Sequence, residues 1–156
     1  MQYKKYDALE EAERDISYAV LDPDPSLKAT LGLSRSSFVR WMDSDTDLVA
    51  FLYVGMEPLQ GKAEKVRALV GIFQGHGPRC EPSTVGAPPD RHGAFGLPDG
   101  RQATWGIGGP RTSWKAGFPV WVSWRSKDSK NWMRAEGVNY ELDDIRAIAT
   151  SLSRRE

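Results

Sequence analysis

The chain is poor in cysteine, in net charge and in long apolar runs, and each shortage excludes a class of protein. Cys80 is the only cysteine among 156 residues, so no disulfide can form within the chain. Lysine plus arginine and aspartate plus glutamate number 21 each. The resulting net charge of zero disfavours a nucleic-acid surface, which needs a clustered basic footprint. It also leaves little colloidal repulsion between copies, so a homo-oligomer stays open.

No stretch of the sequence suits a membrane span or a signal peptide. The longest apolar run, residues 48–54, is far too short to cross a bilayer. The first residues lack the apolar core of a signal peptide. We therefore expect a cytoplasmic protein if Met1 is its native start, and an extracytoplasmic one if a leader or a membrane span has been removed.

The N-terminal part of the sequence predicts one helix followed by strands. Residues 7–15 carry apolar side chains at helical spacing, with Asp7 as the expected N-cap. Residues 26–33 alternate between apolar and polar side chains, which is typical of a half-buried strand. Further strands are expected at 38–42 and 47–54. Together with 26–33 they would form an antiparallel meander.

The middle of the chain is harder to interpret. Residues 62–74 fit a helix and a strand, and a strand is favoured because Val, Ile and Phe cluster at the end of the segment. Glycine and proline are frequent in residues 75–100, and a loop of that length is usually functional or disordered. The turn signal at residues 97–100 predicts a hairpin within residues 94–107.

The C-terminal third indicates the class of fold. Residues 118–125 and 131–138 predict two strands joined by a turn, and residues 141–152 predict an amphipathic helix. We expect a single α+β domain over residues 1–156. Its core would be one antiparallel, curved sheet of about six strands, with N- and C-terminal helices packed on one face.

The order of these elements resembles a known but uncharacterised domain. The resemblance rests on the Leu-Glu-Glu-Ala string that starts at Leu9, the Trp-rich strand pair, Tyr140 two residues before Leu142, and the string at residues 148–152. Bacterial anti-sigma-type and sporulation-related membrane proteins carry this domain outside the membrane, and it is similar in shape to the lipoprotein-carrier fold. The resemblance implies a bacterial protein with a sensory or binding role and no catalytic residues.

The tryptophans give the strongest functional signal. Five of them lie between residues 105 and 132, on strands whose alternation cannot turn every ring toward one core. Aromatic side chains gathered on a surface mark binding, and basic residues among them would add cation–π contacts. The alternative is that the rings simply cover a thin, curved sheet. The predicted ligand-binding residues are Trp105, Arg111, Trp114, Trp121 and Trp132.

Residues 75–100 also hold both histidines and the only cysteine, namely His76, Cys80 and His92. Their spacing matches no zinc pattern, and no nucleophile elbow accompanies the cysteine. We therefore expect no metal, no cofactor and no catalytic residue. The sequence favours a non-catalytic module that binds or senses a small apolar ligand or a peptide. Two alternatives stay open: a hydrolase that uses this loop, and a protein-interaction subunit of a regulatory or immunity-like kind.

Overall fold

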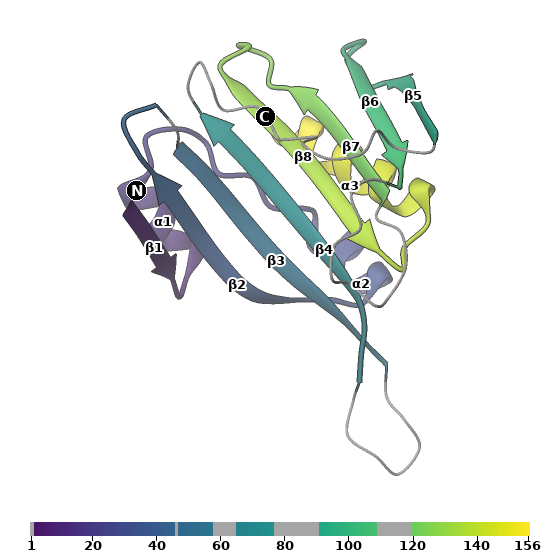
Figure 1. Ribbon diagram of the computed structural model, residues 1–156, viewed down its shortest axis with the longest axis horizontal. Helices are drawn as coiled ribbons and strands as arrows, with labels where there is room; N and C mark the ends of the chain where they lie inside the picture. The colour runs from purple at the N-terminus through teal and green to yellow at the C-terminus, as the bar shows by residue number, and fades with distance from the viewer. Residues whose placement is uncertain (1, 46, 58–64, 77–90, 109–119) are drawn as a thin grey trace.

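The structure is a computed structural model that describes residues 2–45, 47–57, 65–76, 91–108 and 120–156. In these residues the chain forms three helices and eight strands (Figure 1). The helices are α1 (Leu9–Asp15), α2 (Pro25–Leu31) and α3 (Leu142–Arg154). The strands are β1 (Gln2–Tyr6), β2 (Leu33–Met42), β3 (Asp47–Glu57), β4 (Lys65–His76), β5 (Arg91–Gly96), β6 (Gln102–Ile107), β7 (Val120–Arg125) and β8 (Asn131–Val138).

The eight strands form one antiparallel sheet in the order β1-β2-β3-β4-β8-β7-β6-β5. Strands β1 to β4 are one meander, and β5 to β8 are a second. The last strands of the two meanders, β4 and β8, lie side by side and join them (Figure 1). Their register runs from Leu69 opposite Val138 to His76 opposite Asn131. Residues some 55 positions apart in the chain are thereby brought into contact.

The predicted α+β class with an antiparallel sheet is confirmed, but six strands is too few. Strand β1 escapes sequence-based prediction because its first four side chains are exposed and show no apolar alternation. Strand β5 was not predicted over its full length, because it lies within the glycine- and proline-rich residues 75–100. The hairpin expected within residues 94–107 is present, and it begins earlier, at Arg91. The preferred strand at residues 62–74 is also confirmed, over the described part that forms β4.

The prediction of a strand over residues 26–33 is wrong, because Pro25–Leu31 form α2. Leu27 and Leu31 are four residues apart, a spacing that serves one face of a helix as well as one face of a strand. The ends of the segment decide between the two. Pro25 occupies the first turn, where its missing N–H costs nothing. Gly32 ends the helix with a left-handed φ of 66°.

Helix α1 begins one residue later than predicted, since its N-cap is Ala8 and not Asp7. The carboxylate of Asp15, at the other end of α1, instead ties the helix to β1. It accepts a hydrogen bond from Lys4 Nζ at 2.7 Å and another from the Tyr6 hydroxyl at 2.6 Å. These two contacts, first the one from Lys4, hold the pKa of Asp15 below its usual range.

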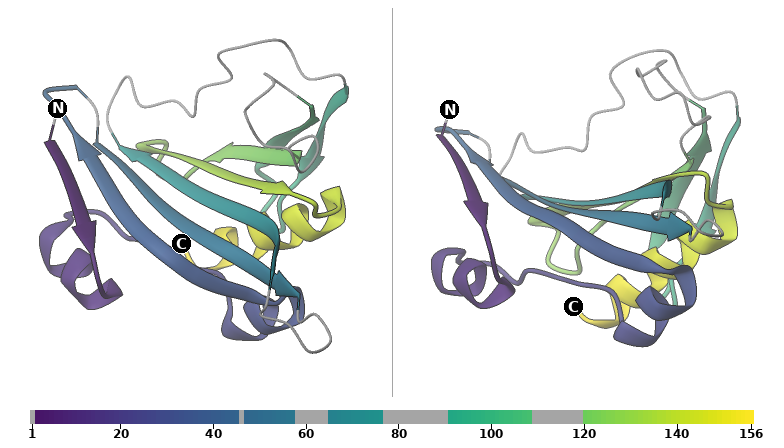
Figure 2. Two further views of the ribbon diagram at one scale, coloured as in Figure 1. Left: turned by 60° about the horizontal axis from the view of Figure 1, so that its bottom comes forward. Right: turned by 90° about the horizontal axis from the view of Figure 1, so that it is seen from below.

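All three helices lie on one side of the sheet, which bends and twists along its width (Figure 2). We call this side the helical face and the other the opposite face. The core lies on the helical face, where Phe38, Phe51, Ile72 and Val122 are almost fully buried. Helix α3 approaches β8 closely: a Cβ added to Gly137 would fall 2.6 Å from Ile145 Cδ1. The glycine therefore permits this packing distance.

The Asp15 cluster predicts a specific acid dependence of stability. The folded protein binds a proton at Asp15 more weakly than the unfolded chain does, so protonation favours unfolding. The stabilisation is fully present above the ordinary aspartate pKa of about 3.9, and it is lost as the pH falls through the lowered pKa. Asp15→Asn should therefore destabilise the protein more at pH 7 than at pH 2.5. Urea unfolding of both proteins across that range measures the effect. An equal difference at both pH values would contradict it.

Candidate functional site

The structure separates the predicted tryptophans between the two faces of the sheet. Trp121 and Trp132 lie on the opposite face. Trp105 is paired with Val122 and lies on the helical face, partly buried against the core. Trp124 is also in the core and is 2% exposed. Arg111 and Trp114 lie outside the described residues. The five predicted residues therefore do not form one surface in the part of the chain that is described.

Trp121 and Trp132 each pack against an arginine on the opposite face. The guanidinium carbon of Arg125 lies 4.4 Å from the centre of the Trp132 ring, and that of Arg134 lies 4.8 Å from the Trp121 ring. Arg134 also forms an ion pair with Glu136 at 3.0 Å. Such contacts contribute about 0.5–1 kcal/mol at exposed sites. Aromatic and basic side chains therefore lie together on this face, but the arginines are Arg125 and Arg134 and not the predicted Arg111.

Trp121 has a packing role that explains much of its burial. Its ring lies over Gly106, the residue directly across the strand pair. A Cβ at Gly106 would fall 2.5 Å from two ring carbons. Only a glycine leaves room for the indole here, and Trp121 is only 8% exposed as a result. Trp132 is less buried, so it is the better candidate for contact with a ligand.

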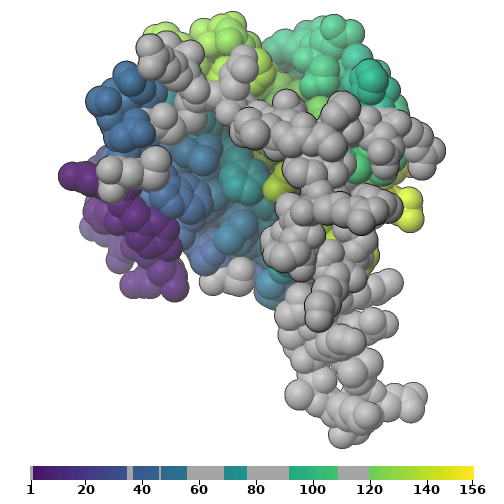
Figure 3. Space-filling view, in the orientation of Figure 1, coloured from purple at the N-terminus to yellow at the C-terminus, as the bar shows by residue number. Residues whose placement is uncertain are grey.

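Figure 3 views the molecule from the opposite face, with side chains of β1, β2 and β3 visible at its left. Tyr3 and Leu52 are the large apolar side chains described as exposed, at 60% and 38%. Both lie on the opposite face, because side chains alternate along a strand. Leu52 follows the core residue Phe51, and Tyr3 lies three positions before the core residue Tyr6. Exposed apolar side chains also occur singly on ordinary protein surfaces.

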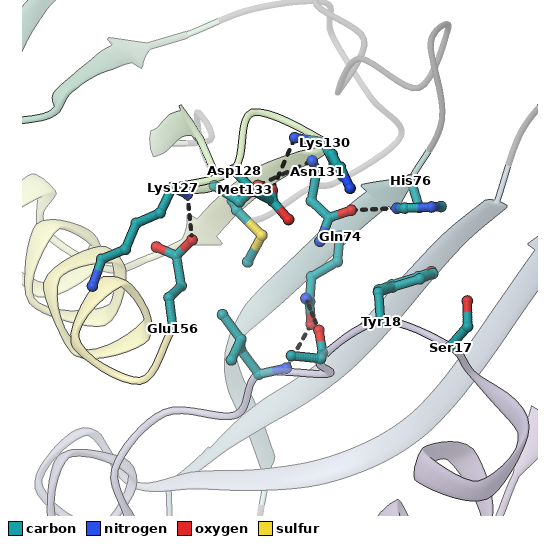
Figure 4. A pocket seen from close by; sticks show the side chains of 13 residues that line it. Ser17, Tyr18, Gln74, His76, Lys127, Asp128, Lys130, Asn131, Met133 and Glu156 are labelled. Carbon is teal, nitrogen blue, oxygen red and sulfur yellow. Dashed lines mark hydrogen bonds between the residues drawn. The ribbon is translucent and has the colours of Figure 1, made fainter.

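A cavity of about 490 Å³ lies on the helical face, at the end of the β4–β8 pair (Figure 4). One wall is the segment between α1 and α2, and another is the turn between β7 and β8. The side chain of Glu156 closes a third side. The lining residues are Ser17, Tyr18, Ala19, Leu21, Gln74, His76, Ser126, Lys127, Asp128, Lys130, Asn131, Met133 and Glu156.

Gln74 holds the first wall against the sheet. Its side chain is 1% exposed. Its Oε1 accepts a hydrogen bond from the backbone N–H of Leu21 at 2.8 Å, and its Nε2 donates to the carbonyl of Ala19 at 2.9 Å. One buried amide thus satisfies a donor and an acceptor of an otherwise irregular segment, as buried polar groups require.

His76 and Asn131 form the last residue pair between β4 and β8, and both line the edge of the cavity. His76 Nδ1 lies 2.5 Å from Asn131 Oδ1, and the His76 ring stacks on Tyr18 at a centroid distance of 4.6 Å. Because an amide oxygen only accepts, Nδ1 of His76 is the donor in this contact. This arrangement fixes the orientation of the imidazole and turns Nε2 away from Asn131.

Two carboxylates fix the outer walls. Asp128 accepts hydrogen bonds from the Ser126 hydroxyl and the Lys130 backbone N–H, which together hold the pKa of its carboxyl below the usual range. Glu156 accepts from the Lys127 backbone N–H at 3.1 Å and forms an ion pair with Arg101 at 2.6 Å. The cavity is thus bounded by side chains that are held in place without a ligand.

Sequence reasoning singled out His76 but missed its surroundings. The partner Asn131 follows from the β4–β8 register, which no local pattern reveals. The structure does not bring His76 and His92 together: they lie on opposite faces, and β4 and β5 are separated by three strands. At about 4.8 Å per strand, the lateral separation is about 19 Å. Cys80 lies outside the described residues. Within those residues, no group of three or more His, Cys, Asp or Glu side chains could hold a metal ion.

Comparisons of the chain with protein-family models, with curated proteins and with solved structures find no match. In the described residues, no helix is long and apolar enough to cross a membrane.

The packing of Trp121 on Gly106 predicts a measurable loss of stability. Gly106→Ala should destabilise the protein by about 1–3 kcal/mol, because the stiff indole ring must move to admit the methyl group. Gly96→Ala is the matched control in the neighbouring strand, where an added Cβ meets nothing within 4 Å. Its effect should stay within about 0.5 kcal/mol. Thermal unfolding compares the two, and equal midpoints would show that Trp121 does not depend on the glycine.

Proposed function

We propose that this chain is a non-catalytic binding module whose ligand is a small molecule held in the cavity between the sheet and the helical side. The cavity itself carries the proposal, because its volume is in the range of small-molecule sites, about 300–1,000 Å³. A binding or sensory role is also what the resemblance to the extracytoplasmic bacterial domain implies.

The walls support binding because they are already fixed. Gln74, His76 and Glu156 each make hydrogen bonds within the protein, so little side-chain freedom remains to be lost when a ligand enters. Leu21 and Met133 add buried apolar surface beside these polar groups. The lining therefore favours a ligand with an apolar body and polar substituents over the purely apolar molecule expected from the tryptophans.

A peptide or protein partner on the opposite face is the second candidate. The observation that favours it is the pairing of partly exposed Trp132 with exposed Arg125. Aromatic and arginine side chains are the types most often found at the energetic centre of protein interfaces. Of the residues that the hydrolase alternative uses, His76 lines the cavity, His92 lies on the opposite face, and Cys80 is outside the described residues. Activity toward ester and amide substrates tests this alternative.

Cavity filling tests the leading proposal. Thermal unfolding is measured with a panel of fatty acids, amino acids, nucleotides, sugars and short peptides. Ala19→Phe places a ring in the cavity mouth and should abolish the stabilisation by the ligand class that binds there, since the ring occupies the same volume. Ala29→Phe is the control, because Ala29 is exposed on α2 and does not line the cavity.

Two outcomes contradict the cavity as the site. Stabilisation that survives Ala19→Phe unchanged would place the ligand elsewhere, and its loss in Trp132→Ala would place it on the opposite face. A panel in which no class raises the unfolding temperature would count against a small-molecule function altogether.

A further inference from the structure

The last strand of the sheet, β5, is an edge strand, and we propose that it pairs with an extended, acidic segment of a partner protein. Within the described residues, no strand lies beside β5 on the side away from β6 (Figure 1). An edge strand carries unpaired backbone N–H and C=O groups, and an extended peptide satisfies them by adding a further strand. This surface shares no lining residue with the cavity at His76, so the proposal goes beyond the function proposed above and does not rest on it.

The two edges of the sheet differ in how they are protected against pairing. The other edge strand, β1, carries Lys4 and Lys5 within five residues, and lysines on an edge discourage the addition of a strand. Strand β5 has the sequence Arg-His-Gly-Ala-Phe-Gly, with no lysine, acidic residue or proline. Ala94 and Gly96 in it are exposed, and a glycine lets a second backbone approach closely. Of the two edges, β5 is therefore the one suited to a further strand.

A groove of about 570 Å³ lies between the end of β5 and helix α3. One side of it is formed by Phe95 and Pro98, and the other by the α3 residues Asp143, Arg146, Thr150 and Arg154. At about 1.5 Å per helical residue, the α3 side is about 16 Å long. An extended chain covers that length with about five residues, which is close to the length of β5 itself. Side chains of a segment paired with β5 would therefore have a place to lie.

The lining of the groove is basic, since it holds two arginines and one aspartate. Asp143 offsets them only partly, because its side chain is 92% exposed and lies 3.8 Å from Arg146. Arg146 also packs on Phe95, with its guanidinium carbon 4.4 Å from the ring centre. Arg154 forms no hydrogen bond or ion pair through its side chain with another described residue. A carboxylate of a bound segment would supply that partner.

The acidic residues next to the lining have other partners. The carboxylate of Asp99 accepts hydrogen bonds from the backbone N–H and the guanidinium of Arg101. Glu156 forms an ion pair with the same Arg101 at 2.6 Å. Neither carboxylate lies within 4.0 Å of the guanidinium of Arg154. The charge of Arg154 is therefore not neutralised by contact with these neighbours.

The strand and the groove together define the chemistry of the partner. Alternate side chains of an added strand face the same side of the sheet. On the helical face, an acidic residue suits Arg154 and an apolar residue suits Phe95. On the opposite face, beside exposed Ala94, small polar residues fit. A second copy of β5 fits less well, because its sequence offers no carboxylate to Arg154.

The experiment uses three hexapeptides that differ in charge. The acidic peptide is acetyl-Thr-Glu-Thr-Val-Thr-Glu-amide, and the other two carry Gln or Lys in place of both Glu. Each is titrated into the full chain, with binding followed by NMR and by hydrogen exchange of the β5 amides. We expect the acidic peptide to bind at least about threefold more tightly than the Gln peptide, within the range for exposed ion pairs. Binding should slow the exchange of every second β5 amide, those that point away from β6.

N-methylation of the acidic peptide separates strand pairing from docking of side chains in the groove. Alternate backbone N–H groups of an extended chain point to the same edge, and an added strand pairs through one edge only. Methylation of every second backbone nitrogen should therefore abolish binding in one of the two possible phases and leave it nearly unchanged in the other. Equal effects of the two phases would contradict pairing with β5.

Matched variants test the charge. Arg154→Gln should weaken binding of the acidic peptide about threefold, whereas Arg14→Gln, which removes the same charge from exposed α1, should leave it unchanged. The proposal is overturned if the three peptides bind equally, or if none of them slows exchange in β5. It is also overturned if the β5 amides become protected without peptide as the protein concentration rises and sedimentation shows a dimer, since a second copy would then occupy the edge.

Discussion

The pairing of β4 with β8 is the contact on which the rest of the structure depends. It joins the two four-stranded meanders into one sheet. It also lines up Ile72 with Ala135 in the core and His76 with Asn131 at the edge of the cavity. Helix α3 packs on the neighbouring strands β7 and β8, and Gly137 of β8 leaves room for Ile145. The hydrophobic core, the last helix and the candidate site are therefore consequences of a single strand register.

Much of the fold could be predicted from local patterns. The strand at residues 131–138 has the predicted bounds, and the amphipathic spacing that predicts the last helix is borne out in α3. Prediction from local patterns fails where one spacing fits both a helix and a strand, as with Leu27 and Leu31 in α2. It also fails at the sheet edges, where strand β1 needs no apolar face because it is mostly exposed. In α2 the proline and glycine at the two ends determine the structure, and in β1 the pairing with β2 does so. Side-chain periodicity decides neither.

The candidate site was less predictable than the fold. Gln74 and Asn131 are polar residues inside strands, and nothing in their local sequence distinguishes them from solvent-exposed positions. Their role appears only when strand pairing places Gln74 beside the segment after α1, more than 50 residues earlier in the chain. The tryptophans were a more obvious signal, but strand alternation assigns Trp124 to the core and Trp121 to the other side, over Gly106. Residue type alone could not separate packing from binding.

The walls of the cavity come from segments that are distant in the chain: the link after α1, the end of β4, the β7–β8 turn and the final residue. The unfolded chain therefore has no equivalent of this hollow, so a ligand bound there, as we propose, would be thermodynamically linked to folding. A ligand present at 100 times its dissociation constant would add about 2.7 kcal/mol to the free energy of unfolding. For a domain of marginal stability, this linkage would make the folded population itself respond to ligand concentration. Under the proposed binding function, the amount of folded protein would then depend on the ligand without any conformational change in the folded state.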